Sequence, residues 1–427
     1  MITLILIGSF FGLLLLRVPV AAAMGLSALF GIQYLGMDIG VLTNVFYAAI
    51  AKNSLLAIPF FILTGVIMDY AGISTRLINF ANAMVGHRKG GLVVVTIITA
   101  CFFAAISGSG PATVAALGGV LIPAMEKDKY NKNFATALVA SAGGIGMVIP
   151  PSIPFVIFAM LTAQSVGTMF MAGVIPGILM GVLFTIAGLW HVRKDKNIII
   201  REKASKAERL HAFKEAMWGI MTPVIILGGI YSGFFTATEA AGVSVVYSLF
   251  VGIFIYKTID IKAFKNLFLS SAVSSGLIMF IMGSAGLFTW ILTTSGVAGQ
   301  MSNSLLSISD SPIVLTLIMQ VIFLIAGCFV DSASGFYLLL PILMPVVIKT
   351  GYPVYAFGVL ATVNFAVGQI TPPVGSNLFV ACNIAKISMS DLVSKLGNFL
   401  IAGIVAILLM SFFPQIITFL PNLMGLN

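Results

Sequence analysis

Charged side chains are too scarce in this sequence to cover a protein that dissolves in water. Only 8% of the 427 residues are charged, and 59% are hydrophobic. A soluble domain carries charge on roughly a quarter of its residues, so most of this surface must face lipid. Only helices and closed barrels satisfy the backbone there. Because about 20 apolar residues cross a bilayer as a helix, we predict an all-α polytopic membrane protein with roughly a dozen passes, allowing for breaks.

Basic residues gather in a few short segments, which indicates how the chain is oriented. Sixteen of the 22 Lys and Arg residues fall within residues 88–89, 127–132, 193–214 and 257–265. Excess positive charge in short loops marks the cytoplasmic side, whereas nucleic-acid binding needs a basic face on a folded domain. We therefore predict no nucleic-acid partner. The third segment also has apolar residues spaced for one helix face, which predicts an amphipathic helix over about 198–216 on the cytoplasmic membrane surface.

Two long apolar stretches are interrupted at their middle by small polar residues. Residues 91–125 begin and end beside cytoplasmic basic residues and are broken by SGSGP at 107–111, while residues 312–348 are broken by DSASG at 331–335 and have flanks that look external. In the first stretch each half is roughly 24 Å long at 1.5 Å per residue, which is short of the ~30 Å hydrocarbon core. We predict two re-entrant hairpins, whose irregular tips must be buried in protein or line a cavity.

A proline pair interrupts the helix that follows each hairpin. Pro150 and Pro151 lie within a predicted helix over 134–162, and Pro372 and Pro373 lie within one over 354–385. The order and spacing of hairpin and break are the same in the two halves, and their charge flanks are opposite. This pattern indicates an inverted repeat with two broken helices, an architecture of secondary transporters that place their sites at such breaks.

The breaks also predict what could bind there. A proline has no N–H, so the carbonyl four residues earlier loses its helical partner. Unpaired carbonyls and hydroxyls are hard oxygen ligands suited to a desolvated Na⁺, and the N-termini of half-helices suit an anionic substrate. The freed carbonyls are those of Gly146, Met147, Gly368 and Gln369, and the nearby hydroxyls are those of Ser107, Ser109, Ser332, Ser334 and Thr371. The alternative is that Gly, Ser and Pro serve helix packing and kinks alone; four breaks in two matched pairs favour a transport site.

Asp331 is the strongest single candidate for a site residue. An acid in the middle of an apolar segment is costly and marks a functional site by default. It could bind Na⁺, accept hydrogen bonds from a substrate, or carry a proton. The alternative is that it caps the half-helix that follows it.

Two other function classes compete with transport. Gly108, Ser109 and Gly110 faintly resemble the nucleophile turn of an intramembrane serine hydrolase, but a serine nucleophile needs a general base. His87, His191 and His211 all lie in the basic loops, so we predict that the chain is not an enzyme. A non-transporting scaffold subunit would not need two matched pairs of broken elements.

Four motifs, in this order, resemble the large membrane subunit of tripartite ATP-independent periplasmic (TRAP) transporters. They are SGSGPATVAA at 107–116, IPPS at 149–152, GGIYSGFFTATEAA at 228–241 and TPPVG at 371–375. The resemblance covers the whole chain, and it departs from the family at Ala237, where proline is frequent. The overall sequence most resembles the sialic-acid branch, ahead of C4-dicarboxylate transporters.

The resemblance implies a Na⁺-coupled importer of an organic acid in the bacterial inner membrane, with membrane lipid around it. It implies two partners, a small four-helix membrane subunit and a periplasmic substrate-binding protein. It also implies an elevator fold, in which a transport domain slides against a scaffold. The expected division is scaffold helices over 1–52, the first repeat of the transport domain over 53–165, further scaffold over 166–269, the second repeat over 270–390, and a C-terminal helix over 391–427. Whether residues 1–35 form one pass or two stays open at this stage.

The family's site residues map onto this sequence through the same motifs. The resemblance implies substrate contacts at Ser109, Ser152 and Asp331. It implies one Na⁺ site at Ser107, Ser109, Gly146, Ile149 and Pro151, and another at Ser332, Gly368 and Thr371.

Overall fold

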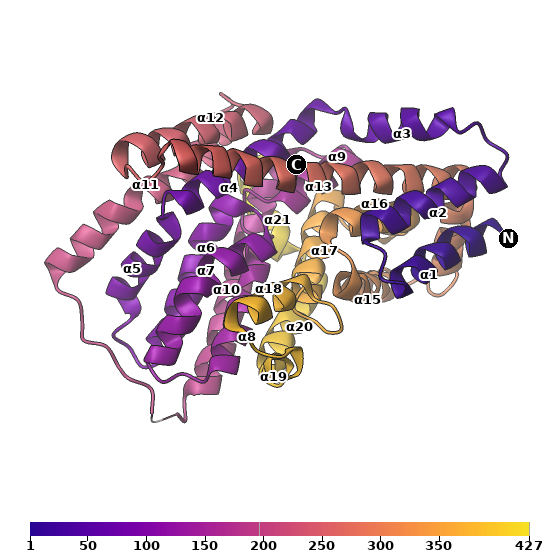
Figure 1. Ribbon diagram of the computed structural model, residues 1–427. Coiled ribbons are helices and arrows are strands. Elements are labelled where there is room, and N and C mark those ends of the chain that lie inside the picture. Colours follow the sequence, from indigo (N-terminus) through magenta and orange to yellow (C-terminus); the bar gives the residue numbers. More distant parts are fainter. Residues whose placement is uncertain (196, 427) are drawn as a thin grey trace.

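The computed structural model describes residues 1–195 and 197–426, and within them the chain is helical without a β-strand (Figure 1). Among these residues, seven helices are long and apolar enough to cross a membrane, or up to eight if one bent pair counts as a single span. The prediction of an all-α polytopic membrane protein is confirmed. Spans of full length are fewer than the roughly dozen expected from composition, because many apolar helices end after 10–17 residues.

The N-terminal region is broken at residues 17–19. A short π-helical turn, Leu4–Gly8, leads into the first α-helix, and Arg17 then takes a left-handed conformation with φ 64°. Pro19 precedes the next helix, as expected for a residue with a fixed φ at a helix start. Residues 1–35 therefore form two helical segments. The helices of this region are α1 (Ser9–Leu15), α2 (Val20–Tyr34), α3 (Gly40–Ile50), α4 (Ala57–Tyr70) and α5 (Ile73–Val85).

The first hairpin and the first broken helix follow. The helices here are α6 (Gly91–Ser107), α7 (Gly110–Lys127), α8 (Lys132–Ile145), α9 (Ile153–Thr162) and α10 (Val166–Val192). We call α6 and α7 the first hairpin, and residues 146–152, between α8 and α9, the first break. Both interruptions coincide with the residues that sequence analysis singled out.

The predicted amphipathic helix over 198–216 has different bounds. Helix α11 (Lys206–Tyr231) begins after Ser205 and continues without interruption into an apolar segment. Its start is fixed by a capping box, in which the Ser205 hydroxyl accepts a hydrogen bond from the Glu208 N–H while the Glu208 carboxylate accepts one from the Ser205 N–H. Residues 199–204 are not helical.

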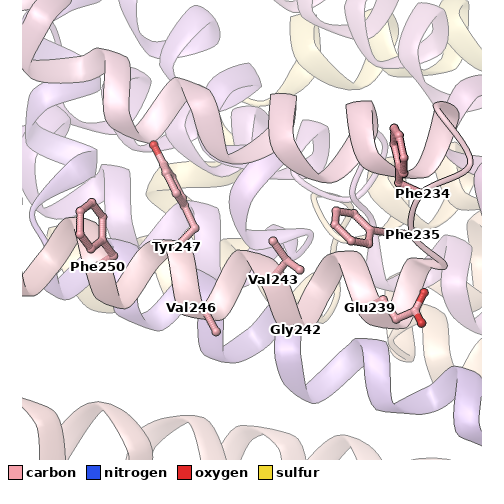
Figure 2. Close-up of a pocket in the computed structure, with 8 residues that line it drawn as sticks. All are labelled: Phe234, Phe235, Glu239, Gly242, Val243, Val246, Tyr247 and Phe250. Carbon is pink, nitrogen blue, oxygen red and sulfur yellow. The ribbon is translucent and has the colours of Figure 1, made fainter.

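Helix α12 (Ala237–Phe250) presents an apolar outer face. Val246 is 68% exposed and Phe250 50% exposed, as expected for side chains that contact lipid. Figure 2 shows Val246 pointing away from α11 and Tyr247 pointing toward it, and the Tyr247 hydroxyl donates to the Trp218 carbonyl of α11 at 2.8 Å. A pocket lined by residues of α12 together with Phe234 and Phe235 is almost entirely apolar, with Glu239 as its one charged residue, which fits a surface in the bilayer.

The second half repeats the order of a kinked helix, a hairpin and a broken helix. Gly296, with φ 76°, separates α13 from α14, as Gly72, with φ 71°, separates α4 from α5. We call α15 and α16 the second hairpin, and residues 369–375, between α17 and α18, the second break. The helices are α13 (Ile261–Thr294), α14 (Val297–Leu306), α15 (Pro312–Phe329), α16 (Ser332–Thr350), α17 (Val354–Gly368) and α18 (Ser376–Ala385).

An ion pair joins the two ends of the second hairpin. The Lys349 ammonium donates to the Asp310 carboxylate at 2.9 Å. Through this hydrogen bond and its charge, Lys349 lowers the pKa of Asp310. Both side chains are well exposed, so the pair contributes little to stability.

The C-terminal region is not the single helix predicted over 391–427. It contains α19 (Met389–Val393), α20 (Gly397–Phe412) and α21 (Gln415–Leu423), with a bend of 61° between α20 and α21. Pro414 caps α21. It cannot continue the ladder of α20 because proline lacks the N–H.

The two helices that precede the breaks lie at the centre of the fold. Residues 134–145 of α8 and 356–368 of α17 are all buried. Around α17, the rings of Phe323, Phe336, Phe357 and Phe365 pack mostly edge to face, with centroids 5.2–6.3 Å apart, which is the favoured aromatic geometry. The hairpin tips thus rest on a closely packed core.

Helix α13 runs along one side of the molecule, from α12 to α2 (Figure 1).

Candidate substrate and cation site

The tip of the first hairpin concentrates oxygen atoms. Gly108 turns the chain with φ 61°, and Ser109 is extended before α7 begins. The Ser107 hydroxyl lies 3.1 Å from the Thr113 hydroxyl, which donates to the Ser109 carbonyl at 2.8 Å. Ser107 and Thr113 are buried. Thr113 was missed by sequence reasoning, although its position four residues after Ser109 predicts that the two meet on one helix face.

This tip packs directly on the first break. A methyl group on Gly146 would collide with the Thr113 hydroxyl and lie 2.9 Å from the Ser109 carbonyl oxygen. On the other side of the tip, a methyl group on Gly108 would lie 2.8 Å from the Pro151 carbonyl oxygen. The tip that carries Ser107 and Ser109 therefore contacts the first break at Gly146 on one side and at Pro151 on the other. The Ile149 side chain packs instead against Gly177 of α10.

The two carbonyls that the prolines free at the first break, those of Gly146 and Met147, differ in their hydrogen bonding. The Ser152 hydroxyl donates to the Met147 carbonyl and accepts a hydrogen bond from the Phe155 N–H at 3.5 Å, which caps α9. Ser152 is fully buried. None of the hydrogen bonds among the described residues ends on the Gly146 carbonyl, so that oxygen keeps its capacity to bind a cation.

Asp331 caps the second half of the second hairpin. One carboxylate oxygen accepts from the Ser334 N–H and the other from the Ser334 hydroxyl, both at 3.0 Å. Asp331 therefore caps α16, as the capping alternative predicted. A carboxylate has about four acceptor sites, so this cap leaves Asp331 able to contact a ligand as well.

The second hairpin contacts the second break through its backbone. Gly327 lies against Gly368, and the Gly375 N–H donates to the Cys328 carbonyl at 3.2 Å. The Thr371 hydroxyl donates to the Val367 carbonyl at 2.7 Å, and the Gly368 carbonyl accepts from the Thr371 N–H at 2.9 Å. Gly368 and Thr371 are thus neighbours.

A cavity of about 290 Å³, the central cavity, lies between the two hairpin tips. Ser109, Asp331 and Ser332 all line it, with Gln369 and Ser376 from the second break and α18. Of the three substrate contacts expected, Ser109 and Asp331 share this cavity, and Ser152 is not among its lining residues. Its size is at the lower end for ligand pockets, which suits a small acid.

A second cavity of about 430 Å³, the side cavity, adjoins the central cavity. It shares Ser109 and Ile278 with the central cavity and extends between α4 and α13 to Asp69. No Lys or Arg lines either cavity within the described part of the chain. Any anion here must be held by neutral donors and helix N-termini.

Comparison with known proteins decides the family. The sequence profile of the family described as "Tripartite ATP-independent periplasmic transporter, DctM component" matches residues 7–416. The chain belongs to this family. It is a multi-pass permease of the inner membrane, and its relatives are named as transporter permeases rather than enzymes. As the family description states, such a permease is one component of a tripartite transporter.

Several relatives of the permease are similarly close. It is 35% identical to the C4-dicarboxylate TRAP transporter large permease DctM of Rhodobacter capsulatus, over the full length of both chains. It is also 35% identical to the sialic acid TRAP transporter large permease SiaM of Vibrio cholerae, over 98% of this chain and 99% of that one. A third relative is the isethionate TRAP transporter permease protein DctMQ of Oleidesulfovibrio alaskensis, 40% identical over 95% of this chain. The permease spans 64% of the length of that protein.

A solved structure shares the fold of the permease. The YdaH transporter of Alcanivorax borkumensis superposes with a TM-score of 0.61 over 90% of this chain and 88% of that one, at 16% sequence identity. The helical transporter fold is thus confirmed. The preference for the sialic-acid branch is not, because identity to the C4-dicarboxylate relative is equal.

Proposed function

We propose that the permease is the large membrane subunit of a secondary transporter that imports an organic acid together with Na⁺ and without ATP. The observation that supports this most directly is the central cavity, because Ser109 of the first hairpin and Asp331 of the second line the same space. Helices α7, α16 and α18 begin at or beside lining residues. Helix N-termini favour negative charge, so the cavity suits an acid despite its lack of basic side chains.

Coupling to Na⁺ is supported by the oxygen atoms at the first break. The Ser107 and Thr113 hydroxyls and the Ser109 carbonyl lie close together, and the backbone of Gly146 packs against Thr113 and Ser109. These oxygen atoms are hard ligands, and the Gly146 carbonyl would add another. Within the described residues no group of three or more His, Cys, Asp or Glu side chains could hold a metal ion, so transition-metal chemistry has no ligand set there. We assign one Na⁺ to Ser107, Ser109, Gly146, Ile149 and Pro151, and another to Ser332, Gly368 and Thr371.

The two hairpins and two broken helices would move as one transport domain. The backbone contacts between tip and break in each half support this, because elements that move as one rigid group keep their binding sites intact during the movement. The helices outside 53–165 and 270–390 would act as scaffold. A small four-helix membrane subunit and a periplasmic substrate-binding protein would complete the tripartite assembly.

The substrate class is a small organic acid. The named substrates of the three relatives are a C4-dicarboxylate, sialic acid and isethionate, all of which are anions near neutral pH. Sialic acid, the preference from sequence, is one candidate of three.

The test is uptake into proteoliposomes that hold the permease with its small subunit, supplied with the binding protein. Succinate, sialic acid and isethionate would be offered under an inward Na⁺ gradient, without ATP. At least one acid should accumulate, and accumulation should stop when K⁺ replaces Na⁺. Full uptake in Na⁺-free K⁺ medium would contradict the coupling.

A further inference from the structure

Gln369 is a buried amide of the second break that reaches the first hairpin. Its side chain is 4% exposed, and its Oε1 atom is buried without a hydrogen-bond partner. A methyl group on Gly110, the first residue of α7, would lie 2.6 Å from this oxygen. Gln369 therefore stands where the two halves of the chain meet, although 259 positions separate it from Gly110.

The same side chain lines the central cavity. Ser109, Asp331 and Ser376 line it as well, and the Ser376 hydroxyl is also buried without a partner. The Gln369 amide nitrogen makes no hydrogen bond among the described residues. A half-turn of the Gln369 amide about its terminal bond exchanges the positions of its oxygen and its nitrogen. Gln369 can therefore present its N–H donors to a ligand in the cavity, and the unpartnered Ser376 hydroxyl can donate as well.

The chemistry of the cavity indicates which part of the ligand Gln369 would meet. Asp331 is the one charged side chain among the described lining residues, and an ionised carboxylate only accepts hydrogen bonds. An acid's anionic group would be repelled by Asp331 and needs donors elsewhere in the cavity. A Gln amide nitrogen carries two N–H donors and a Ser hydroxyl one, and both Gln369 and Ser376 lie beside the N-terminus of α18.

We propose that Gln369 is a specificity-determining residue that donates hydrogen bonds to the anionic group of the transported acid, with Ser376 beside it. This inference rests on the proposed function, import of an organic acid. Hydrogen bonds to a charged group are about twice as strong as neutral ones. The amide therefore selects for a carboxylate or sulfonate at this end of the cavity, while Asp331 accepts from hydroxyl or amide groups at the other.

The experiment compares three variants in the uptake assay with the acid that the wild-type protein transports. In Gln369→Leu the side chain keeps a similar size but loses its N–H donors. In Gln369→Glu a negative charge faces the anion. The matched control is Gln320→Leu. Gln320 is also 4% exposed, and one atom of its amide, Nε2, is buried without a partner. Its Oε1 atom accepts from the Asn364 amide at 2.5 Å between α15 and α17, and Gln320 does not line the central cavity.

Gln369→Leu should raise the KM for the acid about ten- to a hundredfold, the effect of losing a charge-assisted hydrogen bond. Gln369→Glu should raise it at least as much. The Na⁺ concentration for half-maximal uptake should not change in either variant, and Gln320→Leu should leave the KM within about twofold. If Gln369→Leu does not fold, as judged by gel filtration and thermal unfolding, Gln369→Met replaces it with a more flexible side chain.

An unchanged KM in a folded Gln369 variant would overturn the proposal. A shifted Na⁺ requirement with unchanged KM would also overturn it, because Gln369 would then belong to a cation site. Failure of the wild-type protein to take up any of the three acids would count against the proposed function, and the inference would fall with it. Normal wild-type uptake with an insensitive Gln369→Leu variant would refute the inference alone.

Discussion

The backbone of Gly368, at the end of α17, packs directly against the backbone of Gly327 in α15. A methyl group on Gly368 would lie 2.6 Å from the Gly327 Cα atom and 2.9 Å from its carbonyl oxygen. These neighbours are backbone atoms, so no side-chain rotation can make room. This contact holds the second hairpin on the second break.

Gly368→Ala should therefore push α15 away from the second break. Overpacking of this kind typically lowers the free energy of unfolding by about 1–3 kcal/mol, and it would also disturb the second Na⁺ site. Thermal unfolding of purified protein measures the first effect, and the Na⁺ dependence of uptake measures the second. Gly276→Ala in α13 is the matched control, because no atom lies within 4 Å of the added methyl group. Equal stability of the two variants would show that the contact can relax.

Asp331→Asn separates the charge of this residue from its capping role. Asn and Asp rank alike as N-caps, so stability should change by less than about 1 kcal/mol. Losing a charge-assisted hydrogen bond should weaken substrate or Na⁺ binding by roughly 1.5–3 kcal/mol, about ten- to a hundredfold. Uptake against substrate and Na⁺ concentration, at matched expression, measures this.

The control for Asp331→Asn is Asp260→Asn. Asp260 caps α13 by accepting from the Ala263 N–H at 2.6 Å, and it lines neither cavity. Its replacement should leave both affinities unchanged. Wild-type affinities in Asp331→Asn would restrict Asp331 to the cap and leave the serines to bind the substrate.

Ser109→Ala and Ser152→Ala should have different effects. Ser152 is buried, caps α9 and donates to the Met147 carbonyl, so its loss should cost about 0.5–2 kcal/mol of stability. Ser109 is partly exposed and lines the central cavity, so its loss should raise the KM with little change in stability. Thermal unfolding and uptake kinetics distinguish the two. A rise in KM for a stable Ser152→Ala variant would support the substrate contact that the family resemblance implies for this residue.

The orientation of the hairpins can be tested with a membrane-impermeant maleimide. Cys101, Cys328 and Cys382 are the native thiols, and they are first replaced by Ser or Ala. Single cysteines at Lys129 and Lys203 should then react only from the cytoplasm, and one at Ser309 only from the periplasm. Reaction of positions 129 and 309 from the same side would refute the inverted repeat.

Sequence patterns predicted the elements of this fold where the cause is local. The proline pairs and the Ser-Gly-rich segments interrupt helices through their own backbone chemistry, so both hairpins and both breaks were located to within a few residues. The start of α11 was also readable from sequence, because Ser205 and Glu208 have the spacing of a capping box. The amphipathic pattern, however, was followed back to residue 198, so the predicted helix began before the capping box.

Contacts between distant segments could not be read from spacing. Gln369 and Ser376 were not predicted to line a cavity, because their position depends on how the second break meets the first hairpin. The same holds for Asn377, whose side-chain amide donates to the Ala140 carbonyl at 3.4 Å. The direction of a hydroxyl is equally invisible to sequence, and the Ser152 hydroxyl turns to the Met147 carbonyl while Ser152 lies outside the lining of the central cavity.

Helix α13 sets a condition on the surrounding bilayer. Its 34 residues make a rod of about 51 Å at 1.5 Å per residue. To fit within a ~30 Å hydrocarbon core it would have to tilt by about 54°, beyond the usual range. One end must therefore rest among lipid headgroups, and the N-terminal end is suited to this. Lys262 and Lys265 offer charge, and Phe264 and Phe268 offer exposed rings. Anionic lipids would attract those lysines, so the lipid composition of the membrane would affect the depth at which the permease sits.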